Sequence, residues 1–287
     1  MNIHEFRFDG SKKFKLSEFD TKQKGSFDNK QEALDIKDDY IFELQELQNR
    51  LYAEGVEGVL VIFQAMDAAG KDGAIKYVMS GVNPAGVNVH NFKVPTPEEY
   101  AHDYLWRASR VGPERGKITL FNRSYYEDVL VVKVHQLHKK TPLPKRCITE
   151  DIFENRFRQI RDYERHLYEN GFRIIKIFLH ISKDEQKKQF LQRIDDPAKN
   201  WKFSSGDVKE RGFWDQYMNA YEEAINATST THAPWYVVPS DRKWFARAVI
   251  SEILVGELKD INPQYPVLPE EEKEKLSLYK EQLQNES

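Results

Sequence analysis

Short apolar runs alternate with longer helix-compatible segments through the middle of the chain. Five runs have the length and composition of strands that are covered on both faces, at residues 59–63, 87–92, 118–121, 174–181 and 235–238. Each run is separated from the next by sequence compatible with a helix. Because alternating strands and helices form parallel sheets, we predict an α/β fold with a parallel sheet of about five strands flanked by helices.

Apolar spacing and capping residues predict the longer helices. Apolar positions recur at steps of three and four over residues 30–54. Ser182 and Glu185 have the spacing of a capping box, and the helix that they begin should end near Pro197. Ser240 and Asp241 are expected to cap a further helix that runs to about residue 258.

Side-chain types then assign faces and ends to these segments. Phe190, Leu191 and Ile194 are expected to face the protein interior. The tail from Pro269 onward predicts a polar helix of mixed charge. The first thirty residues have no clear period, so we interpret them as an arm laid over the surface that orders only against a partner. The expected organisation is an arm and helix over 1–54, a catalytic domain over 55–258 and a helical tail over 259–287.

Composition restricts the possible partners and compartments. The 287 residues include 43 Lys and Arg against 46 Asp and Glu, a net charge of -3, so no global charge attracts nucleic acid or an anionic membrane. We expect neither as a partner. Cys147 is the only cysteine, which excludes an intrachain disulfide and a cysteine-rich metal site. No signal peptide or membrane-spanning run is recognisable, and a cytoplasmic location is the expectation.

The segment QAMDAAGKDG, which follows the first apolar run, nearly matches a phosphate-binding P-loop. Ala65 replaces the first glycine of that motif, and Asp72 replaces the final serine or threonine. A strand that leads through small residues into a helix directs backbone N–H groups and the helix dipole at one point, where phosphate binds. The predicted phosphate-binding residues are Ala68, Ala69, Gly70, Lys71, Asp72 and Gly73.

Asp67 changes the chemistry expected of this loop. A carboxylate beside phosphates is repulsive unless a metal lies between them, so Asp67 predicts a magnesium ligand. Lys71 would place an ammonium group against the phosphate oxygens. The alternative interpretation is a turn in which Asp67 caps the backbone and Lys71 is an ordinary surface residue.

A second polar group follows the third apolar run. Asn122 and Arg123 should lie at the carboxyl end of that strand, the edge at which open α/β sheets bind ligands. Arg123 can bind a phosphoryl group through two parallel hydrogen bonds. Glu127 and Asp128 lie one turn onward and can supply the acidic function that neutral Asn122 lacks.

Cations after residue 182 form the third candidate feature. Arg193, Lys199 and Lys202 can close over an anionic chain and exclude water, although a solvated charged face is the usual meaning of such a pattern. Lys93, after the second predicted strand, can extend the phosphate track and is equally compatible with an ordinary surface position.

These motifs together resemble the polyphosphate kinase type 2 family. The resemblance is carried by GVLVIFQAMDAAGKDGAIK, NFKVPTPEE, GKITLFNRSYYEDVLV, QRIDDPAKNWKFSSGD and THAPWYVVPSDRKWFAR, in the family's order over about residues 54–258. It implies a P-loop kinase fold similar to thymidylate kinase, with a helical lid over about 184–215. It also implies transfer of a phosphoryl group between inorganic polyphosphate and an adenine or other purine nucleotide, with Mg²⁺ or Mn²⁺ and in a homo-oligomer, a dimer or tetramer.

The resemblance also implies roles for individual residues. Asp67 would hold magnesium with Glu127, and Lys71, Arg123 and Arg193 would contact the transferring phosphoryl group. Lys199 and Lys202 would bind polyphosphate, and Lys93 joins them from its position after the second predicted strand. Asn122, Arg123 and Glu127 would bind the nucleotide, and Asp128 joins them from its place beside Glu127. The pairing of Asn122 with Glu127 resembles the class III subgroup, which accepts both AMP and ADP.

Two other functions remain compatible with the sequence. An ATP-dependent nucleoside monophosphate kinase would use the same fold, although Ala65 and Asp72 depart from its usual P-loop. A protein that binds polyphosphate without turnover would need only the cations. Base preference, chain-length preference and the favoured direction of the reaction are not encoded in recognisable motifs.

Overall fold

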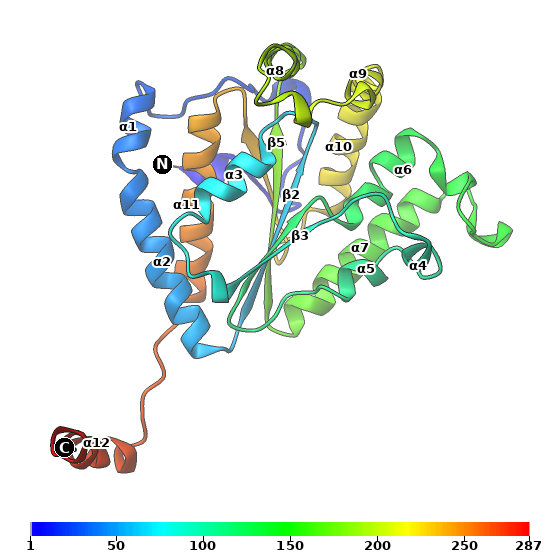
Figure 1. Ribbon diagram of the computed structural model, residues 1–287. Coiled ribbons are helices and arrows are strands. Elements are labelled where there is room, and N and C mark those ends of the chain that lie inside the picture. The colour runs from blue at the N-terminus through cyan, green and yellow to red at the C-terminus, as the bar shows by residue number, and fades with distance from the viewer. Residues whose placement is uncertain (1, 287) are drawn as a thin grey trace.

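A computed structural model describes residues 2–286, and its centre is a six-stranded sheet (Figure 1). The strand order is β1-β6-β5-β2-β4-β3. Five strands run parallel: β2 (Gly58–Ala65), β3 (Val87–Asn91), β4 (Ile118–Asn122), β5 (Phe172–His180) and β6 (Trp235–Pro239). The expected parallel sheet is therefore confirmed. The sixth strand, β1 (Arg7–Phe8), pairs antiparallel with β6 and was not predicted.

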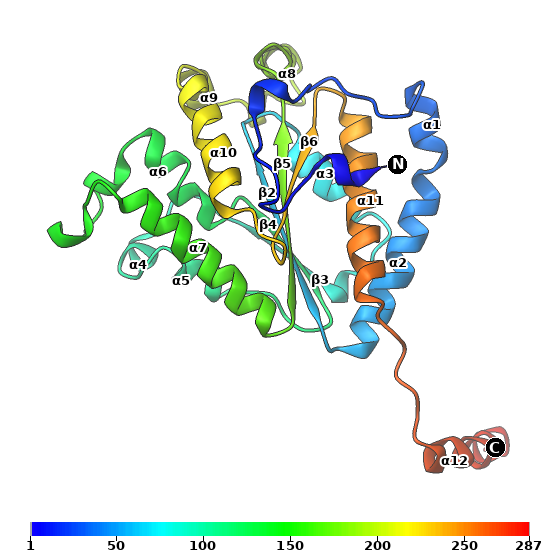
Figure 2. The same ribbon diagram turned by 180° about the vertical axis from the view of Figure 1, so that it is seen from behind.

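Helices cover both faces of this sheet (Figures 1 and 2). On one face lie α2 (Lys37–Glu54), α3 (Lys71–Val78) and α11 (Lys243–Ile261), with α11 packed against the other two. On the opposite face lie α7 (Ile152–Glu169) and α10 (Trp214–Thr228). Because both faces are covered, all eight residues of β2 are buried, which explains its unbroken apolar run.

Shorter elements complete the chain. The remaining α-helices are α1 (Lys30–Asp35), α4 (Pro97–Tyr100), α5 (Trp106–Ser109), α6 (Val131–Val134), α8 (Lys183–Asp195), α9 (Ser205–Arg211) and α12 (Glu270–Gln284). The 3₁₀ turns are η1 (Ile3–Glu5), η2 (Leu16–Glu18), η3 (Pro84–Gly86), η4 (Tyr125–Asp128), η5 (Leu137–Lys139), η6 (Lys145–Cys147) and η7 (Asn200–Lys202). No helix within residues 2–286 is both long enough and apolar enough to cross a membrane.

The arm before α1 belongs to the core, contrary to its interpretation as a surface segment. Phe6 and Phe14 are almost completely buried, and the ring of Phe6 packs against Phe245 of α11 at 6.1 Å between centroids. The backbone of Phe6 also accepts a hydrogen bond from the N–H of Val237 in β6. The arm therefore extends the sheet edge and orders against its own chain.

Three local predictions are correct only in part. The helix over 30–54 is divided at Ile36 into α1 and α2. Ser182 caps α8, but the capping box is incomplete. The backbone N–H of Ser182 donates to the side chain of Asp241 at 2.7 Å instead of to Glu185. Asp241 is thus engaged with α8 and does not cap α11, whose N-cap is Arg242.

The expected inward face of α8 is only partly correct. Phe190 is buried, whereas Leu191 and Ile194 are each about half exposed. The reason is the position of α8, which projects beyond the carboxyl edge of the sheet rather than packing along its face (Figure 1). Only one side of α8 therefore has a protein neighbour.

Candidate active site

The loop between β2 and α3 has the strained backbone of a phosphate-binding turn. Ala68 has φ 64° and Gly70 has φ 100°, both in the left-handed region. Glycine occupies that region freely, whereas Ala68 does so at a cost that surrounding structure must offset. The two turns bring the start of α3 to the carboxyl end of β2, so the free N–H groups of α3 face the space above the sheet.

A cavity of about 1020 Å³ lies above this loop and collects nearly all the predicted site residues. The residues predicted from sequence that line it are Asp67, Ala68, Ala69, Gly70, Lys71, Asp72, Gly73, Lys93, Asn122, Arg123, Arg193, Lys199 and Lys202. We call it the P-loop cavity. Residues more than a hundred positions apart thus meet at one edge of the sheet, as the strand order requires.

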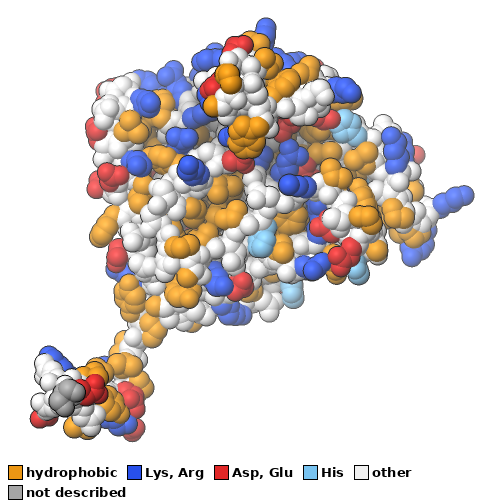
Figure 3. All heavy atoms as spheres, viewed as in Figure 1, with side chains coloured by type: hydrophobic (Ala, Val, Ile, Leu, Met, Phe, Trp, Pro, Cys, Tyr) orange, Lys and Arg blue, Asp and Glu red, His pale blue; other side chains and the backbone are white. Residues whose placement is uncertain are grey.

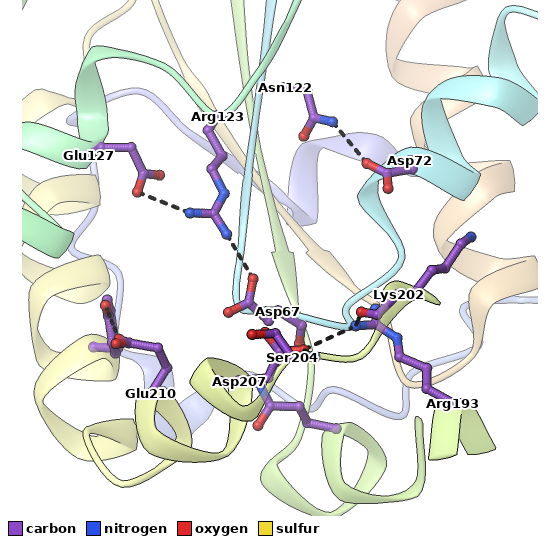
Figure 4. A network of polar contacts seen from close by, with 12 residues as sticks. Asp67, Asp72, Asn122, Arg123, Glu127, Arg193, Lys202, Ser204, Asp207 and Glu210 are labelled. Carbon is purple, nitrogen blue, oxygen red and sulfur yellow. Dashed lines mark hydrogen bonds and ion pairs between the residues drawn. The ribbon is translucent and has the colours of Figure 1, made fainter. Parts of the chain in front are cut away.

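The guanidinium of Arg123 lies between two carboxylates (Figure 4). Its Nη2 is 2.7 Å from Asp67 Oδ1, and its Nη1 is 3.6 Å from Glu127 Oε2. Glu127, and to a smaller extent Asp67, raise the pKa of Arg123. Arg123 has φ 61°, a left-handed conformation that turns its side chain across the end of β4 toward the loop.

The side chain of Asp72, which replaces the usual hydroxyl of a P-loop, has a defined partner. Asn122 Nδ2 donates to Asp72 Oδ1 and to Asn91 Oδ1, both at 2.8 Å (Figure 4). A neutral amide at position 122 can make these two donor contacts, whereas a carboxylate would repel Asp72. The two departures from the usual motifs therefore compensate each other structurally.

Lys71 is placed to bind an anionic group in the P-loop cavity. Burial lowers the pKa of Lys71, and nearby Arg123 lowers it further, while Asp67, Glu127 and Asp72 act in the opposite direction. An anion in the P-loop cavity would stabilise the charged ammonium group. Lys71 is thus a phosphate-binding candidate whose charge is incompletely balanced by protein.

The segment from α8 to α9 covers the same cavity. Arg193 is 3.6 Å from Asp207, and its Nη1 donates to the backbone oxygen of Lys202 at 3.1 Å. Asn200 donates to the backbone oxygen of Arg193 at 2.8 Å. These contacts fold the segment into one unit that presents cations over the P-loop (Figure 4).

Sequence reasoning missed two cations at the start of α11. Lys243 and Arg247 line the P-loop cavity and are four residues apart, hence on one side of the helix. Their side chains lie beside Gly70 and Gly73 respectively, and a Cβ on Gly73 would be 3.4 Å from Arg247 Nη2. The sequence did contain a signal for these two cations, because both follow the carboxyl end of the strand predicted at residues 235–238. Figure 3 shows Lys and Arg side chains gathered on this side of the molecule near α8.

Asp128 faces a different cavity. It lines a second space of about 570 Å³, which we call the side cavity, and lies 3.6 Å from Arg156 of α7. Burial raises the pKa of Asp128 to about 6. The structure therefore does not bring Asp128 to Asp67, and the expected help with magnesium falls to Glu127 alone.

Residues that line the two cavities are connected at three points. Val94 lines the P-loop cavity and Pro95 lines the side cavity. Likewise Arg123 lines the P-loop cavity and contacts Glu127. Asp128, the residue after Glu127, lines the side cavity. Arg107 connects them further, because it lines the side cavity and its Nη1 donates to the backbone oxygen of Lys93 at 2.8 Å.

A buried ion pair supports η4, the turn that carries Glu127. Lys176 Nζ lies 2.6 Å from Glu164 Oε2, and both residues are fully buried. The hydroxyls of Tyr125 and Tyr126 donate to Glu164 Oε1 at 3.0 and 2.8 Å. Because the buried charges are paired and hydrogen-bonded, this network can hold η4 in one position on the sheet.

The donor set near Arg123 suits a magnesium ion. Asp67 and Glu127 contact different nitrogens of the same guanidinium, and carboxylate oxygens are ligands that Mg²⁺ prefers. Within residues 2–286 no group of three or more side chains forms a complete metal site. Mg²⁺ characteristically takes one or two carboxylates and completes its shell with substrate phosphates and water, so Asp67 and Glu127 suffice as protein ligands.

Comparison with known proteins places these features in a family context. The model of the family "Polyphosphate kinase 2 (PPK2)" matches residues 28–266. An ADP-polyphosphate phosphotransferase from Rhodopseudomonas palustris is 45% identical over 277 residues, covering 96% of each chain. An AMP/ADP-polyphosphate phosphotransferase from Meiothermus ruber is also 45% identical, covering 96% of this chain and 99% of the relative. The crystal structure of polyphosphate kinase 2 from Arthrobacter aurescens TC1 superimposes with a TM-score of 0.87 at 37% identity, covering 96% of this chain and 95% of that one.

Proposed function

Because this chain belongs to the polyphosphate kinase 2 family, we propose that it transfers the terminal phosphoryl group of inorganic polyphosphate to AMP and to ADP. The transfer is reversible because donor and product are both phosphoanhydrides. The observation that carries the proposal is the group of Asp67, Lys71, Arg123 and Glu127 at the junction of two cavities.

The P-loop cavity suits a polyphosphate donor. Nine cationic residues line it against three acidic ones, Asp67, Asp72 and Asp207; the cations are Lys71, Lys76, Lys93, Arg123, Arg193, Lys199, Lys202, Lys243 and Arg247. A chain of phosphates can exchange its hydration for contacts with these cations along its length.

The side cavity suits the nucleoside of the acceptor. Tyr104, Leu143 and Ile152 contribute apolar surface to it, and Asp128 with Arg156 contributes polar groups. Its volume of about 570 Å³ lies within the range of about 300–1,000 Å³ that small-ligand sites usually have. A nucleotide with its base in the side cavity would direct its phosphates toward Arg123 and the P-loop.

The proposed chemistry depends on charge stabilisation and positioning. Lys71, Arg123 and Arg193 would offset negative charge on the transferring phosphoryl oxygens, and no general base is needed because the attacking phosphate oxygen is already ionised. Asp67 and Glu127 would hold Mg²⁺ or Mn²⁺. When bound, the ion would neutralise part of the charge on the phosphates. Closure of residues 184–215 would exclude water.

Acceptance of both AMP and ADP rests on two supports. The relative from Meiothermus ruber carries both acceptors in its name. In this chain Asn122 is neutral and its Nδ2 donates to Asp72 and Asn91, so the site has one negative charge fewer than it would have with aspartate at that position. We place the reaction in the cytoplasm, where nucleotides are available.

The function is tested by mixing the protein with magnesium, polyphosphate and either AMP or ADP and following the products by chromatography. We expect ADP and ATP from AMP, and ATP from ADP. A parallel mixture with ATP in place of polyphosphate and AMP as acceptor separates this function from an ATP-dependent monophosphate kinase. Absence of product from both acceptors with polyphosphate would contradict the proposal.

A further inference from the structure

The C-terminal segment has no partner within the described chain. Helix α12 stands apart from the body of the protein in both views, joined to it by a thin connection (Figures 1 and 2). All of its described residues from Glu270 to Gln284 are exposed. A polar helix of 15 residues is marginally stable in water on its own, so α12 should form securely only when something covers one side of it.

One side of α12 is apolar and bordered by lysines. Leu276, Tyr279 and Leu283 follow one another at steps of three and four and are 51%, 46% and 66% exposed. Lys273 and Lys280 lie three and four residues from Leu276, which places them along the edge of this stripe. We call this side the α12 stripe.

Most of the remaining charges of α12 follow the same division, although Glu272 lies four residues before Leu276, on the side of the stripe, and pairs with Lys275 at 2.9 Å. Lys275 lies four residues from Tyr279 and borders the α12 stripe from the other edge. Glu274 and Glu281 are offset from the stripe residues by two or five positions and face away from it. A side that combines apolar residues with a positive border fits an apolar surface with a negative border.

Helix α2 carries such a surface on its outer side. Phe42, Gln45, Asn49, Tyr52 and Val56 recur at steps of three and four along the helix and just past its end. None of the five is charged, and Phe42, Tyr52 and Val56 are 66%, 46% and 58% exposed. We call this side the α2 stripe.

The border of the α2 stripe is mainly acidic. Asp38, Asp39 and Glu46 each lie three or four residues from Phe42, and Arg50 is the only cation of α2 after its first residue. The two stripes therefore match in apolar character, and their borders are opposite in charge. Apolar contact supplies affinity, and the charged borders fix orientation.

The connection to α12 leads away from α2 of its own chain (Figures 1 and 2). The end of α2 and the start of the tail are tied together, because the N–H of Gln264 donates to Glu54 Oε1 at 3.2 Å. Pro263, Pro266 and Pro269 recur every third residue after Asn262. Proline at this spacing favours an extended, stiff chain of about 3.1 Å per residue, so roughly 20 Å separates α12 from the body.

We propose that the α12 stripe of one copy binds the α2 stripe of a second copy of this chain. A stiff connection that leads away from its own α2 can reach the α2 of a neighbour. In a two-fold symmetric pair the exchange is reciprocal, so that each tail covers the partner's helix. Residues 267–287 lie outside the range matched by the family model.

Substitutions within the full-length protein test the contact. Leu276→Glu on the α12 stripe and Phe42→Glu on the α2 stripe should each raise the dimer dissociation constant at least tenfold in sedimentation equilibrium. Leu278→Glu is the matched control, because Leu278 is 52% exposed and lies on the opposite side of α12. A monomeric parent protein, or equal effects of the Leu276 and Leu278 substitutions, would overturn the proposal.

Cross-linking identifies which surfaces meet. In a Cys147→Ser background, chains carrying Phe42→Cys and Tyr279→Cys are mixed and treated with a flexible bis-maleimide. We expect a cross-linked dimer from the mixture and none from either chain alone. Dimers of the Phe42→Cys chain alone, dimers of the Tyr279→Cys chain alone, or an intrachain link in a chain that carries both cysteines would each contradict the exchange. Neither test depends on the proposed enzymatic activity.

Discussion

Arg123 contacts Asp67 and Glu127 at once, and this contact sets the charge balance at the junction of the two cavities. Without phosphates, the guanidinium offsets one of the two carboxylate charges. When phosphates enter, the carboxylates need a cation of their own, which explains why two acids are tolerated in a site for a polyanion. Arg123 can therefore bind the phosphates of the substrate while Asp67 and Glu127 bind a metal ion.

Asp67→Asn should lower kcat about 10²–10³-fold, because the amide retains the hydrogen bond to Arg123 but loses the charge that holds the metal. Asp72→Asn is the matched comparison, since Asp72 is bonded to Asn122 and exposed. We expect its loss to be roughly tenfold or less. Steady-state kinetics with saturating magnesium measures both, and equal losses would show that Asp67 has no special role.

Asp128 predicts a pH dependence of stability. Its pKa is raised from 3.8 to about 6 by burial, so the folded protein binds this proton more tightly than the unfolded chain does. The folded state is therefore favoured below pH 4, and this contribution is lost as pH rises through about 6.

The free energy of unfolding of the parent protein relative to Asp128→Asn should fall between about pH 4 and pH 6, by up to about 3 kcal/mol for a shift of about two pKa units. Urea denaturation at several pH values measures the difference between the two proteins. A difference that is constant across this range would contradict the burial of an ionisable Asp128.

Helix α11 has both a packing role and a binding role. Its middle packs against α2 and α3, while its first turns deliver Lys243 and Arg247 to the P-loop cavity. Lys243 also donates to Gln189 Oε1 of α8. Burial lowers the pKa of Lys243. Nearby negative charge therefore does not fully balance the charge of this ammonium group.

Lys243→Met should raise the KM for polyphosphate about tenfold and leave the KM for AMP unchanged, since a charge-assisted contact contributes about 1.4 kcal/mol or more. Lys259→Met, near the other end of the same helix and remote from the cavity, is the control. A rise in both KM values, or an equal effect of the control, would place Lys243 outside the donor site.

The N-terminal arm matters at the scale of the whole molecule. It crosses from β6 to the start of α1 and places Phe6, Phe14 and Phe27 against the core, although it lies outside residues 28–266 that match the family model. The backbone N–H of Phe14 donates to Asn226 of α10 at 2.8 Å, so the arm also touches the opposite helical layer. The folded unit therefore begins near the N-terminus rather than at α1.

Phe14→Ala should lower the free energy of unfolding by about 3–5 kcal/mol, because Phe14 is almost completely buried. Lys13→Ala, at the exposed neighbouring position, should change it by about 0.5 kcal/mol or less. Chemical denaturation measures both variants. Equal small effects would show that the arm detaches from the core in solution.

The sequence by itself determined the α/β class, the five parallel strands and most of the residues around the P-loop cavity. Buried parallel strands need unbroken apolar runs, and the carboxyl ends of such strands must meet at one edge of the sheet. Local patterns therefore contained both the fold and the positions of Asp67, Lys71, Asn122 and Arg123.

Only the tertiary structure decided which of these side chains face each other. Glu127 and Asp128 are adjacent in sequence, yet η4 turns one toward Arg123 and the other into the side cavity. The local sequence predicts Asp241 as a helix cap, but its side chain accepts a hydrogen bond from Ser182. The N-terminal arm has no periodicity because its buried phenylalanines each fill a separate gap in the core. Such outcomes depend on contacts between residues far apart in the chain, which the local pattern of polar and apolar residues does not record.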